Sequence, residues 1–591
     1  MVNSRSTIGV LAILLSTAFL STACSASNGS IDYVIVGGGP AGLVLAERLS
    51  RDGLKQVLLL EAGKKTYDST LINTPAYFPF ITEPLWNYTV QPDSNLAGNT
   101  PGVPQGHMLG GGTAVNGMAY CRGAASVFDE WAEISGNPGL AWDSLLDDFR
   151  DTTHYVDPPA AGYSQFVNMT AYGDGPLELS RSSGLTGFEE PFANSIQRTL
   201  GLRQVDMNDG TGIGVDMGVS SIFAGNRTRS SASTAYAPLM EGRPNVQIFY
   251  DAWVSRIGFS GNRAVNVTYY SDEKSFTVRG KEIILSAGAL NTPKLLLLSG
   301  VGPKDELQAL GIPIVADVPS IGGNLRDHAL SIVQLLVTPE VLTVWQWSEN
   351  ETQAATARDQ YTESATGPLG WADGFTYAAL RLPDSVFEGL NDTHYTSLPR
   401  DRPHVLFQAT GIPFMPSVNS SAVTAWASLV QPQASGRVML QSADYRDDPL
   451  IYANYYGTRA DKAAIIAGYQ QLREVLRGEP VSSLITQEYF PGPGVIEDDD
   501  VWAAIQQQTY SFRHPVGTVA LGTALDSNWR IKGLDGIRVV DSSTFPFCTT
   551  CHPQSVLYAL ANRAGKDIIE ADNSSGVSIT SPFQNPFEAA I

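Results

Sequence analysis

The stretch that decides the fold reads IDYVIVGGGPAGLVLAERLSRDGLKQVLLLE and runs from Ile31 to Glu61. Residues 31–36 form a β-branched, apolar run typical of a buried parallel strand. The glycine-rich residues 37–42 follow, and apolar residues at helical spacing then continue to about Gly53. A second apolar strand leads directly into the acidic Glu61. Strand, glycine-rich turn, helix, strand and acid in this order predict a dinucleotide-binding βαβ unit.

Each glycine of this turn has its own task in such a unit. Gly37 permits the tight turn, Gly39 lets the backbone approach the pyrophosphate, and Gly42 lets helix and strand pack closely. The diphosphate lies at the helix N-terminus, where unpaired N–H groups and the dipole favour negative charge. Glu61 follows Gly42 by 19 residues and can accept hydrogen bonds from the adenosine ribose. The candidate dinucleotide-binding residues are Gly37, Gly39, Pro40, Ala41, Gly42, Glu61 and Ala62. A purely structural turn is the alternative, and the turn alone does not separate FAD from NAD.

The composition is that of a large, acidic globular protein. The chain has 591 residues, 43% of them hydrophobic, so it can bury the cores of two or more domains or interleaved lobes. Its 38 basic and 59 acidic side chains give a net charge of −21. This charge argues against nucleic acid or an anionic membrane as a partner. The sequence has no internal repeat, and no apolar run after residue 20 is long enough to span a bilayer.

The N-terminus is typical of a secretory signal peptide. Arg5 precedes an apolar stretch from Ile8 to Leu20, and small residues follow it up to Ala26. We expect residues 1–26 to be cleaved, so that the mature protein is secreted and free of the membrane; a buried or anchoring helix is the alternative. Glycosylation sequons agree with secretion and lie at Asn28, Asn87, Asn168, Asn226, Asn266, Asn350, Asn391, Asn419 and Asn573.

The four cysteines do not form a disulfide scaffold, because cleavage after Ala26 would remove Cys24 and leave an odd number. Cys548 and Cys551, followed by His552, match the short c-type haem attachment pattern. A local disulfide between Cys548 and Cys551 and a pair of free thiols are both favoured over haem, and the sequence does not choose between them. The sequence has no nucleophile elbow and no His-Glu-x-x-His helix, so neither a hydrolase nor a metal site is expected.

Other segments carry a family resemblance. Gly106–Tyr120 (GHMLGGGTAVNGMAY) resembles the first signature of the glucose–methanol–choline (GMC) oxidoreductases, and Gly288–Gly302 (GALNTPKLLLLSGVG) matches their second signature. Gly322–His328 (GGNLRDH) is similar to the stretch that follows that signature in the family. Two motifs near the C-terminus, headed by His514 and containing His552, complete the set. The resemblance covers essentially the whole chain after the signal peptide.

The resemblance implies a mixed α/β fold, in which a Rossmann-like FAD-binding domain is interleaved with a substrate domain built on an antiparallel sheet with helices. We expect the FAD-binding domain to comprise residues 31–141, 229–330 and 505–575. The substrate-binding domain would comprise residues 142–228 and 331–504. The further FAD contacts that the resemblance implies are Gly112, Thr113, Asn116, Gly117, Met118, Ala119, Val254, Asp541, Ser542, Pro553 and Gln554.

The resemblance assigns the chemistry to two histidines. His514, at the head of HPVGT, would take the proton from the substrate hydroxyl while hydride leaves the carbinol carbon for flavin N5, and His552 would hydrogen-bond the same oxygen. Imidazole suits this role because its unperturbed pKa of about 6.5 lies close to working pH. Two adjacent imidazoles should titrate as a coupled pair. Some members tether FAD through a histidine just before the signature asparagine; Val115 stands there, so non-covalent FAD is expected.

The function that the resemblance implies is oxidation of a small-molecule alcohol by a secreted FAD enzyme that passes electrons to O2. A dehydrogenase that uses a quinone or another acceptor is the close alternative. The same fold also hosts a hydroxynitrile lyase and a dehydrating cyclase of fungal secondary metabolism, in which FAD is structural. The histidine pair does not exclude these non-redox enzymes. An aromatic alcohol, a sugar and a polyketide-like intermediate are all open as substrates.

Several positions allow two interpretations. His107 stands where the first signature usually has Arg, Lys or Asn, and either alters flavin electrostatics or is solvated without a role. Arg513 either binds a carboxylate or carbonyl of the substrate or faces away into solvent or a salt bridge, and we favour the outward orientation. By family analogy, the loop 91–105 would act as a lid over the flavin. A group of aromatic residues could line a pocket or fill the core of a sheet, and the core is favoured for most of them. They are Trp345, Trp347, Tyr361, Trp371, Phe375 and Tyr377.

Overall fold

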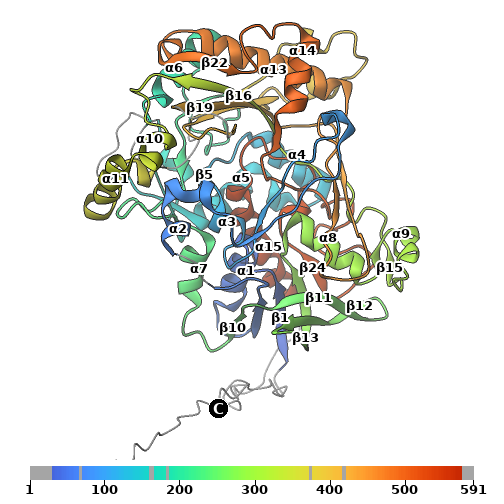
Figure 1. Ribbon diagram of the computed structural model, residues 1–591. Coiled ribbons are helices and arrows are strands. Elements are labelled where there is room, and N and C mark those ends of the chain that lie inside the picture. The colour runs from blue at the N-terminus through green and yellow to red at the C-terminus, as the bar shows by residue number, and fades with distance from the viewer. Residues whose placement is uncertain are drawn as a thin grey trace, which may run out of the picture.

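The protein has two stacked lobes, one around each of two large sheets (Figure 1). The computed structural model describes residues 30–65, 69–158, 166–181, 186–371, 376–415 and 421–574. The expected signal peptide, residues 1–26, lies outside them. Within the described part of the chain, no helix has both the length and the apolar character to cross a membrane.

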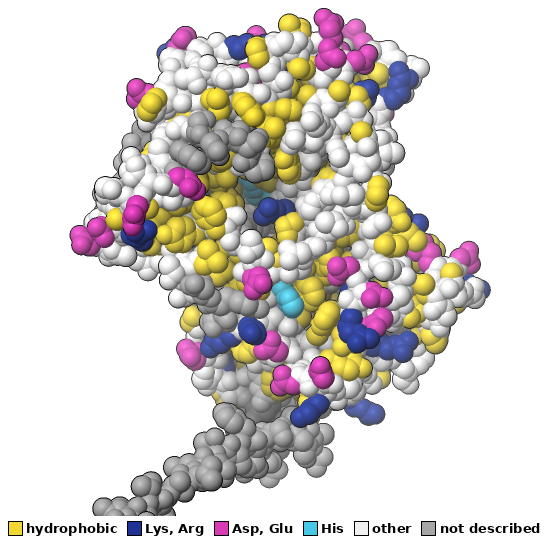
Figure 2. All heavy atoms as spheres, in the orientation of Figure 1, with side chains coloured by type: hydrophobic (Ala, Val, Ile, Leu, Met, Phe, Trp, Pro, Cys, Tyr) yellow, Lys and Arg dark blue, Asp and Glu magenta, His cyan; other side chains and the backbone are white. Residues whose placement is uncertain are grey.

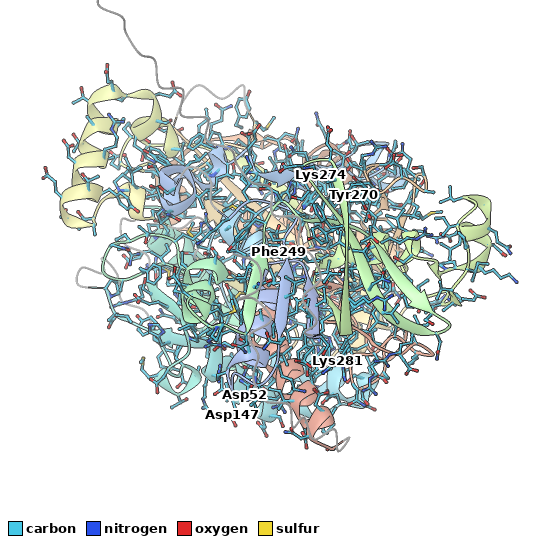
Figure 3. The ribbon with its side chains drawn as sticks, turned by 90° about the horizontal axis from the view of Figure 1, so that it is seen from below. Asp52, Asp147, Phe249, Tyr270, Lys274 and Lys281 are labelled. Atoms are coloured by element: carbon cyan, nitrogen blue, oxygen red, sulfur yellow. A yellow bond between two sulfur atoms is a disulfide. The ribbon has the colours of Figure 1, made fainter. Side chains whose placement is uncertain are left out.

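The lower lobe is built on a sheet with a parallel centre. Its strands are, in spatial order, β10 (Val246–Phe249), β2 (Val57–Leu60), β1 (Ile31–Val36), β13 (Lys274–Leu285), β12 (Arg263–Ser271) and β11 (Trp253–Ser260), with β24 (Ile537–Val539) also paired to β13. β10, β2, β1, β13 and β24 are parallel, so their carboxyl ends meet at one edge of the sheet. β12 and β11 extend the first half of β13 in antiparallel fashion. Figure 3 shows Lys274 and Lys281 far apart along this long strand, with Tyr270 beside Lys274.

Helices from distant parts of the chain cover this sheet. They are α1 (Pro40–Ser50), α5 (Trp142–Thr152), α7 (Ala232–Met240) and α15 (Gln554–Ser574). α1 begins with Pro40 in the first helical position, where its fixed φ suits a helix start. α1 packs against both α7 and α15, and α15 packs against α5. α15 thereby brings the C-terminal end of the described chain beside its start, where the carboxylate of Asp572 accepts hydrogen bonds from Tyr33 and Lys55.

The upper lobe is built on an antiparallel sheet. Its strands are β22 (Ile485–Phe490), β16 (Ala329–Val337), β19 (Ala422–Leu429), β18 (Val405–Thr410), β17 (Tyr377–Leu380) and β8 (Gly214–Asp216), with β23 (Thr509–Ser511) also paired to β16. α13 (Arg459–Arg477) covers one face of the sheet and packs against α6 (Glu189–Leu200). Because side chains alternate along a strand, Val333 of β16 joins the core under α13 while Leu330 and Ile332 join Trp426 on the opposite face.

The two lobes are interleaved more finely than the sequence suggested. Leu145 and Phe149 of α5, expected in the substrate domain, are buried in the same core as the parallel sheet. In the other direction, Tyr88 and Leu96, expected in the FAD-binding domain, are buried in the core of the upper lobe. The fold class itself, a Rossmann-like lobe interleaved with a lobe on an antiparallel sheet, is confirmed.

The described chain contains further helices and strands outside these two sheets and their covering helices. The remaining helices are α2 (Ser69–Asn73), α3 (Gly112–Val115), α4 (Ala125–Ser135), α8 (Gly288–Leu298), α9 (Lys304–Ala309), α10 (Val344–Glu349), α11 (Glu351–Ser364), α12 (His394–Ser397) and α14 (Asp498–Gln507). The remaining strands are β3 (Leu85–Trp86), β4 (Gln105–Gly106), β5 (Ala119–Tyr120), β6 (Thr153–Tyr155), β7 (Leu177–Arg181), β9 (Val219–Ser220), β14 (Val301–Gly302), β15 (Ala316–Asp317), β20 (Arg437–Met439) and β21 (Leu450–Tyr452).

Candidate active site

A cavity of about 610 Å³ is lined by both lobes, from Val36 at the end of β1 to Trp426 on β19. Figure 2 shows a hollow on this face, with hydrophobic side chains around it and histidine and basic atoms in its depth. All the residues named above as FAD contacts or as the histidine pair line the cavity except Gly42. Segments that are more than five hundred residues apart in sequence, such as those of Gly37 and Gln554, therefore line one cavity.

Backbone atoms of several glycines form one part of the cavity wall. A Cβ atom added at Gly39, Gly112 or Gly288 would meet no atom within 4 Å, so the backbone itself borders the open space. Gly42 is different, because a Cβ there would lie 2.0 Å from the carbonyl oxygen of Gly37. Only glycine at this position lets α1 lie so close to the turn.

Glu61 holds the glycine-rich turn from the end of β2. Its Oε2 accepts a hydrogen bond from the Gly38 amide at 2.7 Å, and its Oε1 accepts one from the Gly63 amide at 2.8 Å. Burial raises the pKa of Glu61, and these two amides oppose the rise. A carboxylate has further lone pairs, so Glu61 can still accept from a ligand in the cavity.

Asn116 and Gln554 join the first signature to the start of α15. The Asn116 Nδ2 donates to the Gln554 Oε1 at 3.0 Å, and the Gln554 amide donates to the carbonyl oxygen of Ala119. The Asn116 Oδ1 accepts from the Met118 amide at 3.1 Å and from the buried Arg229 at 2.8 Å. These bonds fix both amide side chains at the cavity wall.

Asp541 ties the end of β24 to the second signature. Its Oδ2 accepts from the Gly288 amide at 2.9 Å and from the Thr292 hydroxyl at 2.6 Å, while its Oδ1 accepts from Ser543. Ser542 accepts from the Ala289 amide at 3.3 Å. Burial raises the pKa of Asp541, and its hydrogen bonds oppose the rise. Both residues therefore position the start of α8 at the cavity as well as lining it.

The two predicted histidines face each other in the cavity. The His514 Nε2 lies 3.4 Å from the His552 Nδ1, and the ring centroids are 5.1 Å apart in an edge-to-face arrangement. Phe512 stacks on His514 with the ring centroids 4.6 Å apart. The Gln408 Nε2 lies 3.1 Å from the His552 Nε2, on the far side of that ring.

A third histidine, His328, lies on the other side of His514. We call the three rings, in the order His328, His514, His552, the histidine row. The His328 Nδ1 lies 3.1 Å from the His514 Nδ1, and the His328 Nε2 lies 3.0 Å from the carbonyl oxygen of Thr549. A carbonyl only accepts, so the His328 Nε2 carries the proton and its Nδ1 accepts from the His514 Nδ1. The His514 Nε2 is thus left with a lone pair. The Gln408 amide donates to the His552 Nε2, so the proton of His552 is on Nδ1 and faces that lone pair.

The surroundings keep all three rings neutral. Burial, followed by His552, His328 and Arg513, lowers the pKa of His514 well below its ordinary value. Burial, followed by His328, lowers the pKa of His552 to about 3, and burial lowers the pKa of His328 to about 4. The pair therefore offers one proton acceptor and one proton donor side by side.

Asp327 anchors the backbone of this row. Its Oδ1 accepts from the His514 amide at 2.8 Å, and its Oδ2 accepts at 2.5 Å from the hydroxyls of Tyr455 and Ser511. Burial raises the pKa of Asp327 to about 6, although these donors oppose the rise. Asp327, His328 and Gln408 were not among the residues expected in the site. Asp327 and His328 are the last two residues of the GGNLRDH stretch, whose family resemblance could have indicated them. The sequence around Gln408 contains no comparable motif.

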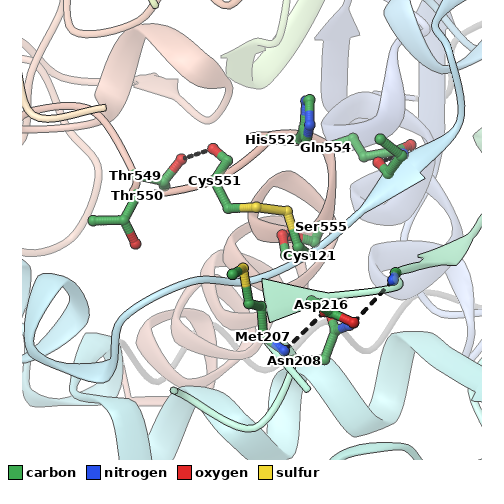
Figure 4. Close-up of a disulfide and its surroundings, with 12 residues drawn as sticks. Cys121, Met207, Asn208, Asp216, Thr549, Thr550, Cys551, His552, Gln554 and Ser555 are labelled. Atoms are coloured by element: carbon green, nitrogen blue, oxygen red, sulfur yellow. Dashed lines mark hydrogen bonds between the residues drawn. A yellow bond between two sulfur atoms is a disulfide. The ribbon is translucent and has the colours of Figure 1, made fainter. Parts of the chain in front are cut away.

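A long-range disulfide holds the loop that carries His552. Cys121 and Cys551 are bonded, with their Cα atoms 6.0 Å apart and 430 residues between them in sequence (Figure 4). Cys548 is buried and free, and burial raises the pKa of its thiol to about 12. Both states weighed from the sequence, a Cys548–Cys551 disulfide and two free thiols, are therefore wrong. The partner in the first signature region was invisible because sequence spacing does not reveal contacts across 430 residues.

Arg513 also corrects an expectation. It lines the cavity instead of facing away from it, and its side chain has no hydrogen bond or ion pair with any described residue. His107 is half-buried, stacks on Trp86 with the ring centroids 3.7 Å apart, and does not line the cavity. From the loop 91–105, the cavity is lined by Gly102, Pro104 and Gln105.

The aromatic residues of the upper lobe are mostly internal. Trp347 and Trp371 are buried in its core, and Tyr361 is partly buried against that core. Tyr377 is buried beside His552, with the ring centroids 5.5 Å apart. The side chain of Trp345 and the whole of Phe375 lie outside the described part of the chain.

Comparisons with known proteins agree with this geometry. Two family models, both described as GMC oxidoreductase, match residues 31–330 and 432–561. The chain is 30% identical to the glucose–methanol–choline family oxidoreductase mfmG of Annulohypoxylon moriforme, over 94% of this chain and 98% of that protein. It is 31% identical to patulin synthase of Aspergillus clavatus, over 92% of each chain.

A solved structure extends the likeness to three dimensions. An FAD-dependent oxidoreductase from Chaetomium thermophilum aligns with a TM-score of 0.84 and 27% sequence identity, over 92% of this chain and 100% of that chain. Both signatures lie within residues 31–330 and the histidine pair lies within residues 432–561, the two ranges that the family models match. The chain therefore belongs to the glucose–methanol–choline family of FAD oxidoreductases.

Proposed function

We propose that this protein oxidises the CH–OH group of a small-molecule alcohol, with His514 as the base and O2 as the electron acceptor. The observation that carries the proposal is the arrangement of the two facing nitrogens. A hydroxyl group donates one proton and accepts another, and the His514 Nε2 and the His552 Nδ1–H offer the complementary acceptor and donor. Both rings line the cavity that also contains the glycine-bordered wall.

The residues of that wall fit FAD. The open space over Gly39, Gly112 and Gly288 admits a ligand against the backbone, and the first N–H groups of α1 have no helical partner and suit a diphosphate. Glu61 can accept from the adenosine ribose, and Asp541 with Ser542 can bond the ribityl chain. Pro553 and Gln554, at the start of α15, would lie near the pyrimidine edge.

Non-covalent FAD is part of the proposal. Val115, on α3, lines the cavity where some relatives carry a tethering histidine, and its isopropyl group has no atom that could form such a bond. FAD, when bound, supplies the acceptor for the hydride from the carbinol carbon. Acid denaturation followed by filtration would separate the yellow colour from the protein if this is right.

The protein residues have two tasks in the proton path. The His514 Nε2 takes the hydroxyl proton as the C–H bond breaks, and the His552 Nδ1–H holds the same oxygen in place. The pKa of His514, lowered chiefly by burial, keeps this nitrogen unprotonated at neutral pH before the reaction. The carbonyl product leaves without the hydroxyl proton and without the transferred hydride, and the proton on His514 then passes to solvent.

Secretion is also proposed. Support comes from the leader-like residues 1–26, from the disulfide between Cys121 and Cys551, and from exposed sequon asparagines such as Asn226 and Asn350. Expression in a eukaryotic secretory host, followed by deglycosylation, would test this through the mass of the secreted protein and its new N-terminus at about residue 27.

The central experiment is anaerobic mixing of the purified holoenzyme with a panel of alcohols, followed by its visible spectrum. Bleaching of the flavin band by one class of alcohol would establish redox catalysis and name the substrate class. Rapid return of the colour on readmission of air would support O2 as acceptor, and slow return would favour a quinone or another acceptor. A flavin that no alcohol reduces would contradict the proposal and favour a lyase or cyclase.

A further inference from the structure

Arg513 is a cationic side chain with no partner inside the cavity. It lines the cavity and is exposed to its open space, and no described residue bonds its guanidinium group. Its φ angle is +63°, a left-handed conformation that few non-glycine residues adopt. Two hydrogen bonds hold this conformation. The Ser511 hydroxyl accepts from the Arg513 amide, and the Asp327 carboxylate accepts from the His514 amide.

The charges around Arg513 leave its positive charge uncompensated. Burial lowers the pKa of Arg513, and no acidic side chain in the described part of the chain counteracts the effect. The acidic residues among those lining the cavity are Glu61 and Asp541, and each already accepts two or more hydrogen bonds from the glycine-rich and signature segments. The other cation of the lining, Lys294, lies over Trp253 and has Asp448, Asp447 and Asp444 nearby.

An aromatic wall stands next to Arg513. Phe512 stacks on His514, Trp426 meets Phe512 edge to face at 5.7 Å, and Phe414 stacks on Trp426 at 5.9 Å. These rings line the cavity together with Tyr510. This part of the cavity therefore combines a flat apolar surface, one uncompensated cation and the proton-accepting nitrogen of His514.

We propose that the substrate alcohol carries a carboxylate on a ring-containing skeleton, and that Arg513 binds this carboxylate. A planar guanidinium group matches the two oxygens of a carboxylate, and one positive charge is neutralised by one negative charge. A phosphate dianion would leave a negative charge uncompensated against an apolar wall. The inference rests on the proposed alcohol oxidation, and it adds the class of alcohol.

The carboxylate takes no part in the redox step. The carbinol carbon gives two electrons and its hydrogen to FAD as hydride, the hydroxyl proton goes to the His514 Nε2, and a carbonyl compound with its carboxylate intact is the product. Arg513 directly precedes His514 in the chain. The carboxylate bound by Arg513 and the carbinol group beside His514 can therefore belong to one small molecule.

The test measures binding and needs no turnover. Benzoate and benzamide have the same size and shape but differ in charge, and both can be titrated into the oxidised holoenzyme while the flavin spectrum is followed. We expect the wild-type protein to bind benzoate at least about tenfold more tightly than benzamide. Arg513→Gln should weaken benzoate binding by about 10- to 100-fold, and Arg513→Lys, which keeps the charge but not the planar fork, should retain part of the preference.

Lys294→Gln is the matched control, because it removes one positive charge from the same cavity at a side chain with acidic neighbours. It should keep the preference for benzoate. Equal binding of benzoate and benzamide by the wild-type protein, or a preference that survives Arg513→Gln, would overturn the inference. An equal loss of benzoate affinity in Lys294→Gln would also overturn it, because the preference would then come from the total positive charge of the cavity and not from Arg513. Since benzoate has no hydroxyl group, a positive result here combined with no flavin reduction by any alcohol would reject the proposed oxidation alone.

Discussion

Replacement of His328 tests the histidine row most directly, because two substitutions each keep a different half of its bonding. Asn places a polar atom near the Nδ1 position, so His328→Asn can still accept from the His514 Nδ1. Gln places one near the Nε2 position, so His328→Gln can still donate to the Thr549 carbonyl but not accept from His514. Only the first variant preserves the tautomer that leaves the lone pair on the His514 Nε2.

The expected size of the effect follows from one buried hydrogen bond. A buried donor left without a partner costs about 1–3 kcal/mol, and each 1.36 kcal/mol changes a rate tenfold, so flavin reduction in His328→Gln should fall about 5- to 150-fold. His328→Asn should lose much less. The assay is anaerobic stopped-flow reduction by a substrate alcohol, at saturating substrate, with the FAD content of each variant as a control for folding. If His328→Gln reduces its flavin as fast as His328→Asn, the tautomer argument is refuted.

Three further outcomes are expected. His514→Ala should keep bound FAD but lose about 10²- to 10⁴-fold in alcohol-driven reduction, measured by stopped flow; a loss under tenfold would contradict its role as base. Because burial holds the pKa of His514 well below 6.5, the reduction rate should be constant through neutral pH and fall only at a pH well below 6.5, where the base becomes protonated. A midpoint near the unperturbed value in the pH profile would count against this. Cys121→Ser should lose about 2–5 kcal/mol of stability in urea unfolding, whereas Cys548→Ser, which leaves the disulfide intact, should lose much less; similar losses would reject the bridge as the cause.

The parts of the fold that could be predicted are those with a local cause. The turn at Gly37 and Gly39 requires glycine for backbone reasons that hold in any βαβ unit, so its place after β1 was evident from the sequence. The antiparallel lobe followed only from the family resemblance. Its strands are buried on both sides, so β16 and β19 lack the alternation of apolar and polar residues that would have revealed them.

The parts of the site that could not be predicted depend on contacts between distant segments. Nothing in the sequence distinguishes Gln408 from the other glutamines. Only the position of β18 in the fold brings its Nε2 to 3.1 Å from the His552 Nε2. Arg513 was expected to face away because long cations usually reach solvent, whereas it lines the cavity between the two lobes, which no local pattern in the sequence indicates. The pairing of Cys121 with Cys551 required the whole tertiary structure.

The bridge between Cys121 and Cys551 has a consequence for proteolysis. It closes a covalent loop between residues 430 positions apart, and this loop contains the second signature, the whole antiparallel sheet and the segment leading to His552. A protease that cuts this loop once, for instance at an exposed turn of the upper lobe, produces two chains that remain joined by the bridge. The glycine-rich turn on one fragment and α15 on the other would stay together after such a nick. An enzyme built in this way can tolerate a single cleavage, and the damage would become visible on a gel only after reduction.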